Sequence, residues 1–124
     1  MSARPALHFI CETQLGDFEN EVRRWLALGY DFNRGMVCGE NEIAMWMELG
    51  ERLYEYELLA AVTPVLLDHR VNVMQAQNWD LYQSAVLWNG FYLQWMFRIL
   101  PDKLSMLSMV AHGSVASVDL LPVP

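Results

Sequence analysis

The sequence predicts a mainly α fold: a compact domain of four or five helices around a buried central helix, with one or two short strands at the termini. Apolar residues recur at helical spacing in several long stretches, and the stretch from Trp79 to Leu100 is apolar around most of a helical circumference. Hydrophobic residues make up 54% of the chain and charged residues 19%, which excludes general disorder. We therefore expect residues 1–124 to form a single helical domain.

Each expected element has its own signal. Leu7, Phe9 and Cys11 alternate with the residues between them, as in a strand. The first helix has an apolar stripe, Asp17 as a candidate N-cap and Gly29 in the place of a C′ residue. In chain order, the expected elements are a strand over 6–13, a helix over 17–28, a loop over 30–39 with a short strand at 36–38, and helices over 41–62, 64–77, 79–100 and 102–112.

Caps and prolines delimit the later helices. Asn41 begins the second helix, and Thr63 followed by Pro64 supplies an N-cap and a first-turn proline for the third. Pro101 ends the central helix because proline cannot continue its hydrogen-bond ladder. Gly113 caps the fifth helix, and the apolar segment 115–124 is expected to form a second strand or an extended C-terminal arm, covered by this chain or by another.

Charge and composition narrow the class of protein. The net charge of −7 and the scattered basic residues disfavour nucleic-acid binding and favour partners with basic surfaces. A polar stripe that includes Arg98 argues against a membrane span over the central stretch, and the N-terminus lacks the apolar segment of a signal peptide. Cys11 and Cys38 form no C-x-x-C pair, so we expect two buried, reduced thiols in a cytoplasmic protein. No internal repeat is apparent.

Motifs for phosphate binding, serine hydrolysis, zinc proteolysis and di-iron chemistry are all missing from the sequence. His69 lies between Asp68 and Arg70, but neighbouring helix positions do not face one another. The glutamates of the second helix are expected to form a solvated face rather than a cation site. We therefore expect no catalytic residues, no metal site and no cofactor, and a protein that is not an enzyme.

The favoured function is a small acidic protein–protein interaction module that binds and inhibits or regulates a larger protein, as antiactivators, immunity proteins and inhibitors do. Surplus apolar surface on the second helix and the C-terminal segment predicts a partner with a basic and apolar surface, and homodimerisation is the commonest way to cover such surface. The predicted partner-binding residues are Met45, Glu48, Leu49, Glu51, Arg52, Glu55, Tyr56, Val118, Leu120 and Leu121.

Two other functions remain open, a small-molecule-binding protein or simple enzyme and a structural subunit of a larger complex. The first would use Glu57 as the polar group of an aromatic pocket. The pocket residues would be Trp46, Tyr54, Trp88, Tyr92 and Trp95. Independently of function, Glu57 and Arg70 each fall within an apolar helical arc, which predicts a buried polar pair between them.

Overall fold

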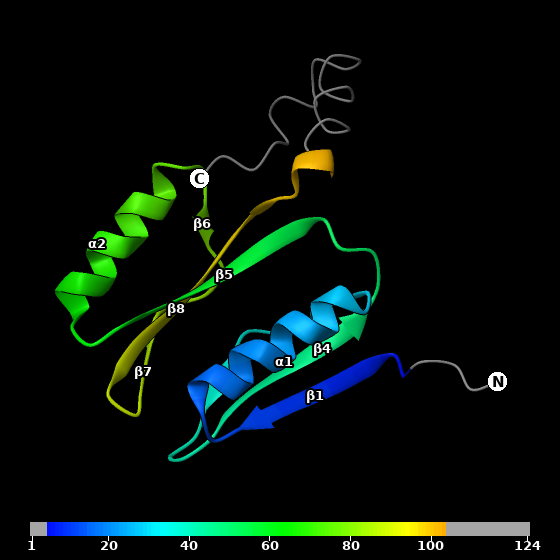
Figure 1. The fold of residues 1–124 in the computed structure, drawn as a ribbon, viewed down its shortest axis with the longest axis horizontal. Helices are drawn as coiled ribbons and strands as arrows, with labels where there is room; N and C mark the ends of the chain where they lie inside the picture. The colour runs from blue at the N-terminus through cyan, green and yellow to red at the C-terminus, as the bar shows by residue number, and fades with distance from the viewer. Residues whose placement is uncertain (1–4, 104–124) are drawn as a thin grey trace.

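The computed structural model describes residues 5–103 and is mostly β, so the prediction of a helical domain is wrong. Two antiparallel sheets of four strands each account for most of the described chain (Figure 1). In chain order the elements are β1 (Leu7–Glu12), α1 (Leu15–Ala27), β2 (Tyr30–Phe32), β3 (Val37–Cys38), β4 (Ile43–Leu49), β5 (Tyr54–Ala61), α2 (Pro64–Gln75), β6 (Asp80–Leu81), β7 (Val86–Trp88) and β8 (Phe91–Ile99).

Several predicted elements are confirmed. The elements β1, α1, β3 and α2 match the strand, helix, short strand and helix expected at those places. Thr63 caps α2 by accepting a hydrogen bond from the Leu66 amide at 3.1 Å, and Gly29 follows α1 with a φ of 98°. Asp17 lies in the first turn of α1, and the N-cap is Gln14 instead.

The predicted helix over 41–62 is wrong because this segment forms β4 and β5. Its alanine, methionine, leucine and glutamate residues favour helix in isolation, but burial follows the period of two that is typical of strands. Ile43, Met45 and Met47 are buried, whereas Trp46 and Glu48 between and after them are exposed. Tertiary packing of one strand face has therefore overridden local helix propensity.

The predicted central helix over 79–100 is also wrong, because it consists of β6, β7 and β8. Trp88 pairs with Phe91 across the two-residue turn of Asn89 and Gly90, whose φ values are 51° and 85°. Positive φ at both positions defines a type I′ turn, for which Asn-Gly is a favoured sequence. The apolar residues of this stretch line both faces of a buried strand rather than the circumference of a helix.

The chain consists of two units with the same order of elements, a first unit over 7–49 and a second unit over 54–99. Their strand registers correspond without gaps: Cys11 pairs with Ala44, and 49 residues later Ala60 pairs with Leu93. Few residues are identical between the units, among them Trp46 and Met47, which correspond to Trp95 and Met96. The structure thus contains an internal repeat that is not apparent in the sequence.

Backbone details support the same correspondence. Gly29 and Asn78, which precede β2 and β6, have positive φ values of 98° and 71°. Asp31 and Asp80, two residues later in each unit, accept a hydrogen bond from the following backbone amide at 2.8 Å. The two units therefore share turn geometry as well as topology.

In the described part of the chain, the units stack so that the second sheet is buried on both faces and the first sheet on one face only. In the first sheet, β4 lies between β1 and the short strands β2 and β3; in the second sheet, β8 lies between β5 and the short strands β6 and β7. Each helix packs on one face of its own sheet, and the other face of the second sheet packs against α1 and β2 to form the large core (Figure 1). Trp95 contacts Phe18 of α1 in this core, and Tyr56 stacks on Phe32 of β2 with ring centroids 3.7 Å apart.

The predicted fifth helix begins where expected, since residues 101–103 are helical. The rest of that helix and the predicted arm over 115–124 lie outside the described residues.

Candidate protein-binding surface

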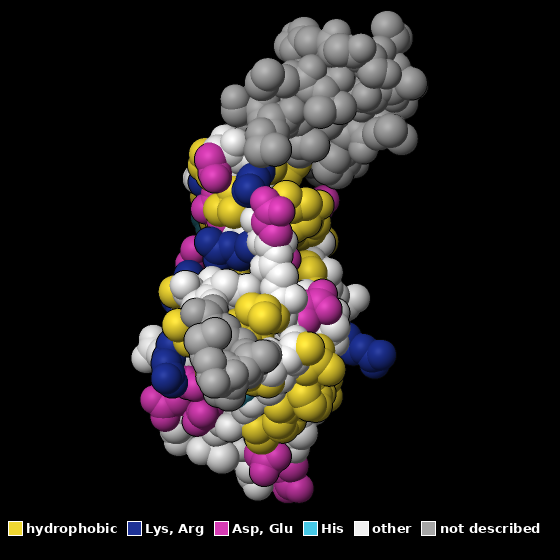
Figure 2. All heavy atoms as spheres, turned by 90° about the vertical axis from the view of Figure 1, so that its right-hand side faces the viewer, with side chains coloured by type: hydrophobic (Ala, Val, Ile, Leu, Met, Phe, Trp, Pro, Cys, Tyr) yellow, Lys and Arg dark blue, Asp and Glu magenta, His cyan; other side chains and the backbone are white. Residues whose placement is uncertain are grey.

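The first sheet has a face whose apolar side chains are largely exposed among the described residues, and we call it the outer face. Strand alternation and the β1–β4 and β3–β4 registers assign seven side chains to it. They are Leu7, Phe9 and Cys11 of β1, Val37 of β3, and Ala44, Trp46 and Glu48 of β4. Figure 2 shows hydrophobic side chains gathered along the right-hand side of the lower part of the molecule, where this sheet lies.

The exposure of these side chains makes the outer face unusual. Leu7, Phe9 and Trp46 are 49%, 47% and 42% exposed, and Val37 is 67% exposed. Phe9 and Trp46 are cross-strand partners with ring centroids 4.9 Å apart, so they form one continuous aromatic surface at the centre of the face. A contiguous apolar patch of this kind on a folded domain is typical of an interaction site.

The two ends of the outer face are acidic. Glu48 is the outer-face residue at one end of β4, and its carboxylate accepts a hydrogen bond from the side-chain Nδ2 of Asn33 at 3.1 Å. Glu42 lies at the other end, where it accepts a hydrogen bond from the Cys11 thiol at 3.4 Å. Desolvation raises the pKa of that thiol, and the hydrogen bond and negative charge of Glu42 raise it further. Within residues 5–103, neither Glu42 nor Glu48 has a cationic partner.

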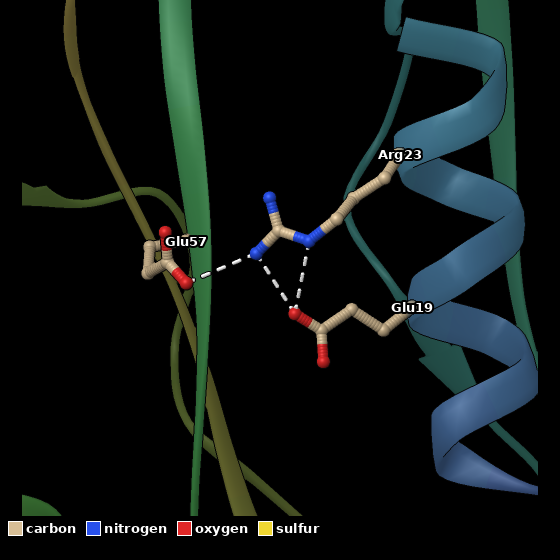
Figure 3. A network of polar contacts seen from close by, with 3 residues as sticks. All are labelled: Glu19, Arg23 and Glu57. Carbon is tan, nitrogen blue, oxygen red and sulfur yellow. Dashed lines mark hydrogen bonds and ion pairs between the residues drawn. The ribbon is translucent and has the colours of Figure 1, made fainter. Parts of the chain in front are cut away.

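Four cationic side chains of the described chain form ion pairs away from the outer face, those of Arg23, Arg24, Arg98 and Lys103, and the Arg23 pair lies at the contact between the units. Figure 3 shows Arg23 reaching from α1 toward β5, where its guanidinium lies 2.8 Å from Glu19 and 3.0 Å from Glu57. These two carboxylates raise the pKa of Arg23, although partial burial opposes the effect. The expected Glu57–Arg70 pair is not formed, because β5 and α2 are not consecutive helices. Arg70 is exposed and donates a hydrogen bond to the carbonyl of Ala60.

Two further polar contacts hold the units together. The Tyr56 hydroxyl donates a hydrogen bond to Asp31 at 2.5 Å, and burial together with this bond raises the Tyr56 pKa well above its usual range. The Gln83 side chain pairs with both backbone groups of Met36, accepting from the amide at 2.6 Å and donating to the carbonyl at 3.2 Å. The position of the outer face is thus fixed by a rigid scaffold rather than by a loop.

The predicted partner-binding residues do not form one surface. Met45 and Tyr56 are buried in the large core, because β4 and β5 turn them inward. Glu51 and Glu55 are paired with Lys103 and Arg98. Arg52 is half-buried, and Leu49 is exposed next to the linker between the units. Only Glu48 lies on the outer face. The remaining three, Val118, Leu120 and Leu121, lie outside the described residues.

The aromatic residues expected to line a pocket are dispersed. Trp88 and Trp95 are buried in the large core, and Tyr92 packs against the smaller core beneath α2. Tyr54 contacts Phe97, whereas Trp46 lies on the outer face. These five side chains therefore do not converge on one ligand.

Phe9, Val37 and Trp46 were not among the predicted partner-binding residues, although all three are exposed on the outer face. Two sequence signals could have indicated these residues. One is the alternation typical of strands, found over 7–12 and again over 43–48, and the other is the Trp-Met pair that occurs at both 46–47 and 95–96. In each pair the methionine is buried, but only the second tryptophan is.

The family models, curated proteins and solved structures compared with this chain give no match. Among the described helices, none is long and apolar enough to cross a membrane. In the same part of the chain, no group of three or more histidine, cysteine, aspartate or glutamate side chains is arranged to hold a metal ion.

Proposed function

We propose that this protein is a protein–protein interaction module that binds a larger protein through the outer face of its first sheet and thereby inhibits or regulates that protein. One observation carries the proposal: Leu7, Phe9, Val37 and Trp46 form a contiguous exposed apolar face on a rigid sheet. Leaving aromatic side chains in water forfeits the free energy that their burial would provide, so a covering partner is favoured.

The charges around this face support a partner with basic and apolar surface. Glu42 and Glu48 border the apolar residues, and neither pairs with a cation in the part of the chain that the structure describes. A partner that buries Trp46 and places lysine or arginine beside these carboxylates would satisfy both requirements. Cys11 is exposed and Cys38 is half-buried, so the expectation of two buried thiols is wrong, but both thiols are free. Free thiols fit a reducing compartment, and we propose the cytoplasm.

The test is affinity capture from the native host with the tagged full chain, in three forms. The wild type is compared with the double variant Phe9→Ser/Trp46→Ser and with Val65→Ser, a matched control on α2 whose side chain is 80% exposed. Circular dichroism first verifies that all three forms are folded.

We expect a stoichiometric partner that the wild type and Val65→Ser retain and that the double variant loses. The purified partner is then assayed for its own activity with increasing amounts of each form. Inhibition or activation by the wild type alone supports the proposal. The proposal is contradicted if the double variant captures the partner as well as the wild type does. It is also contradicted if no form changes the activity of the purified partner.

A further inference from the structure

The internal repeat gives every residue of the outer face a counterpart in the second sheet, 49 positions later in the chain. Trp46 corresponds to Trp95, and Phe9 corresponds to Leu58. The counterparts are covered: Trp95 is 0% exposed, and Leu58 belongs to the same large core. Among residues 5–103, the molecule therefore contains one covered copy and one uncovered copy of the same sheet face.

Two elements of the first unit cover this face of the second sheet, α1 and β2, and Phe32 of β2 contacts the Trp95 ring at 4.9 Å between centroids. The helix α1 lies against this face through Phe18, which contacts the Trp95 ring at 6.4 Å between centroids. Arg23, on the same helix, reaches the second unit through its ion pair with Glu57. An α-helix with an apolar stripe is thus one of the two elements that this kind of face accepts within the chain, whereas the Arg23–Glu57 ion pair lies beside the face because Glu57 alternates with Tyr56 and Leu58.

The acidic ends of the outer face set the length and charge of its occupant. Glu42 and Glu48 are separated by six residues along an extended strand, a span of roughly 20 Å. A helix rises 1.5 Å per residue, so about 13 residues cover that span. The helix α1, which runs alongside β4 in Figure 1, has 13 residues. Basic residues near both ends of a helix of this length would each meet one carboxylate.

We propose that the outer face binds an amphipathic α-helix of the partner protein, with lysine or arginine near both ends of an apolar stripe. This inference rests on the proposed function of the outer face. A second copy of the chain fits less well, because face-to-face contact would bring two sets of Glu42 and Glu48 together, and none of the face's own side chains is cationic.

The probe for this inference is a stapled helical peptide with the sequence of residues 15–27. In its basic form Asp17, Glu19 and Glu21 are replaced by lysine, so that basic residues lie near both ends. One control peptide keeps the native acidic residues, and another carries Phe18→Ser and Val22→Ser in the basic background. Binding of each fluorescent peptide to the full chain is measured by anisotropy at low and high salt.

We expect saturable binding of the basic peptide, with affinity lowered roughly tenfold or more, equivalent to about 1.4 kcal/mol, for either control peptide. The chain variants Trp46→Ser and Glu42→Gln/Glu48→Gln should weaken binding to a similar extent, and Val65→Ser should not. Added salt should weaken binding to the wild type but have little effect on the residual binding to Glu42→Gln/Glu48→Gln.

Binding that is unaffected by Trp46→Ser, or by loss of the apolar stripe, would overturn the inference. A wild-type dimer in light scattering that Trp46→Ser dissociates would assign the face to a second copy instead. If no helical peptide binds while the native partner is still captured through Phe9 and Trp46, the helical occupant is wrong and the proposed function stands. If the double variant retains the native partner, the proposed function itself fails.

Discussion

Trp46 and Trp95 occupy equivalent positions in the two units, and the structure predicts that replacing them by alanine lowers the free energy of unfolding by different amounts. Trp95 is fully buried and packs against Phe18 and Phe32, so Trp95→Ala leaves an enclosed cavity and should cost about 3–5 kcal/mol of unfolding free energy. Trp46 is 42% exposed on the outer face. Its truncation opens to solvent rather than creating a cavity, so Trp46→Ala should cost only about 1–2 kcal/mol, mainly the transfer of its covered half.

Urea unfolding of the full chain, followed by far-UV circular dichroism, measures both values on the same scale. The slope of the free energy with urea should be similar for wild type and Trp46→Ala, because both expose the same surface on unfolding. Trp95→Leu provides an intermediate case if Trp95→Ala does not fold. Equal destabilisation by the two alanine variants, or a greater loss for Trp46→Ala, would show that the two sheet faces are not covered and uncovered as described.

Three further predictions concern the contacts and turns that fix the scaffold. Burial and its hydrogen bond raise the pKa of Tyr56 above the ordinary 10.0, so the stability that the neutral phenol contributes is complete below pH 10 and is lost as the pH rises above it. The free energy of unfolding, measured with urea between about pH 9 and 11, should therefore fall less steeply with pH for Tyr56→Phe than for the wild type. Gly90 has a φ of 85°, so Gly90→Ala should cost about 1–2 kcal/mol in thermal unfolding, whereas Gly16→Ala in α1, which meets nothing within 4 Å, should stabilise by about 0.5–1 kcal/mol. Gln83→Ala removes both hydrogen bonds to Met36 and should cost about 1–3 kcal/mol, with faster hydrogen exchange of the Met36 amide; unchanged exchange would contradict the role of this contact.

The elements predicted correctly are those with local signals. Thr63 and Pro64 specify the start of α2 by a side-chain cap and a fixed φ, and Gly29 specifies the end of α1 by its positive φ. Such signals act within a few residues and do not depend on the rest of the fold. The Asn89–Gly90 turn is a local signal of the same kind, but the prediction of a helix over 79–100 ignored it and therefore missed the β7–β8 hairpin.

The sheets themselves depend on partners distant in the chain. Residues 43–49 are rich in alanine, methionine and glutamate, so they fit a helical wheel as well as a strand. The alternation of Ile43, Met45 and Met47 favours a strand only once β1 is available to pair with β4. The candidate site shows the same limit. Whether Trp46 or Met47 is exposed depends on which face of the first sheet α1 covers, and no local pattern specifies this choice.

The large core also determines how the chain folds. It is assembled from the face of the first sheet that α1 covers and from the face of the second sheet that lies opposite α2. Neither unit therefore encloses this core alone. Separated at the linker over 50–53, each fragment would expose part of a hydrophobic interior, including Phe32 in one and Trp95 in the other. The duplicated units therefore constitute one cooperative folding unit, in which the fragments should be unfolded individually and should regain structure only by complementation.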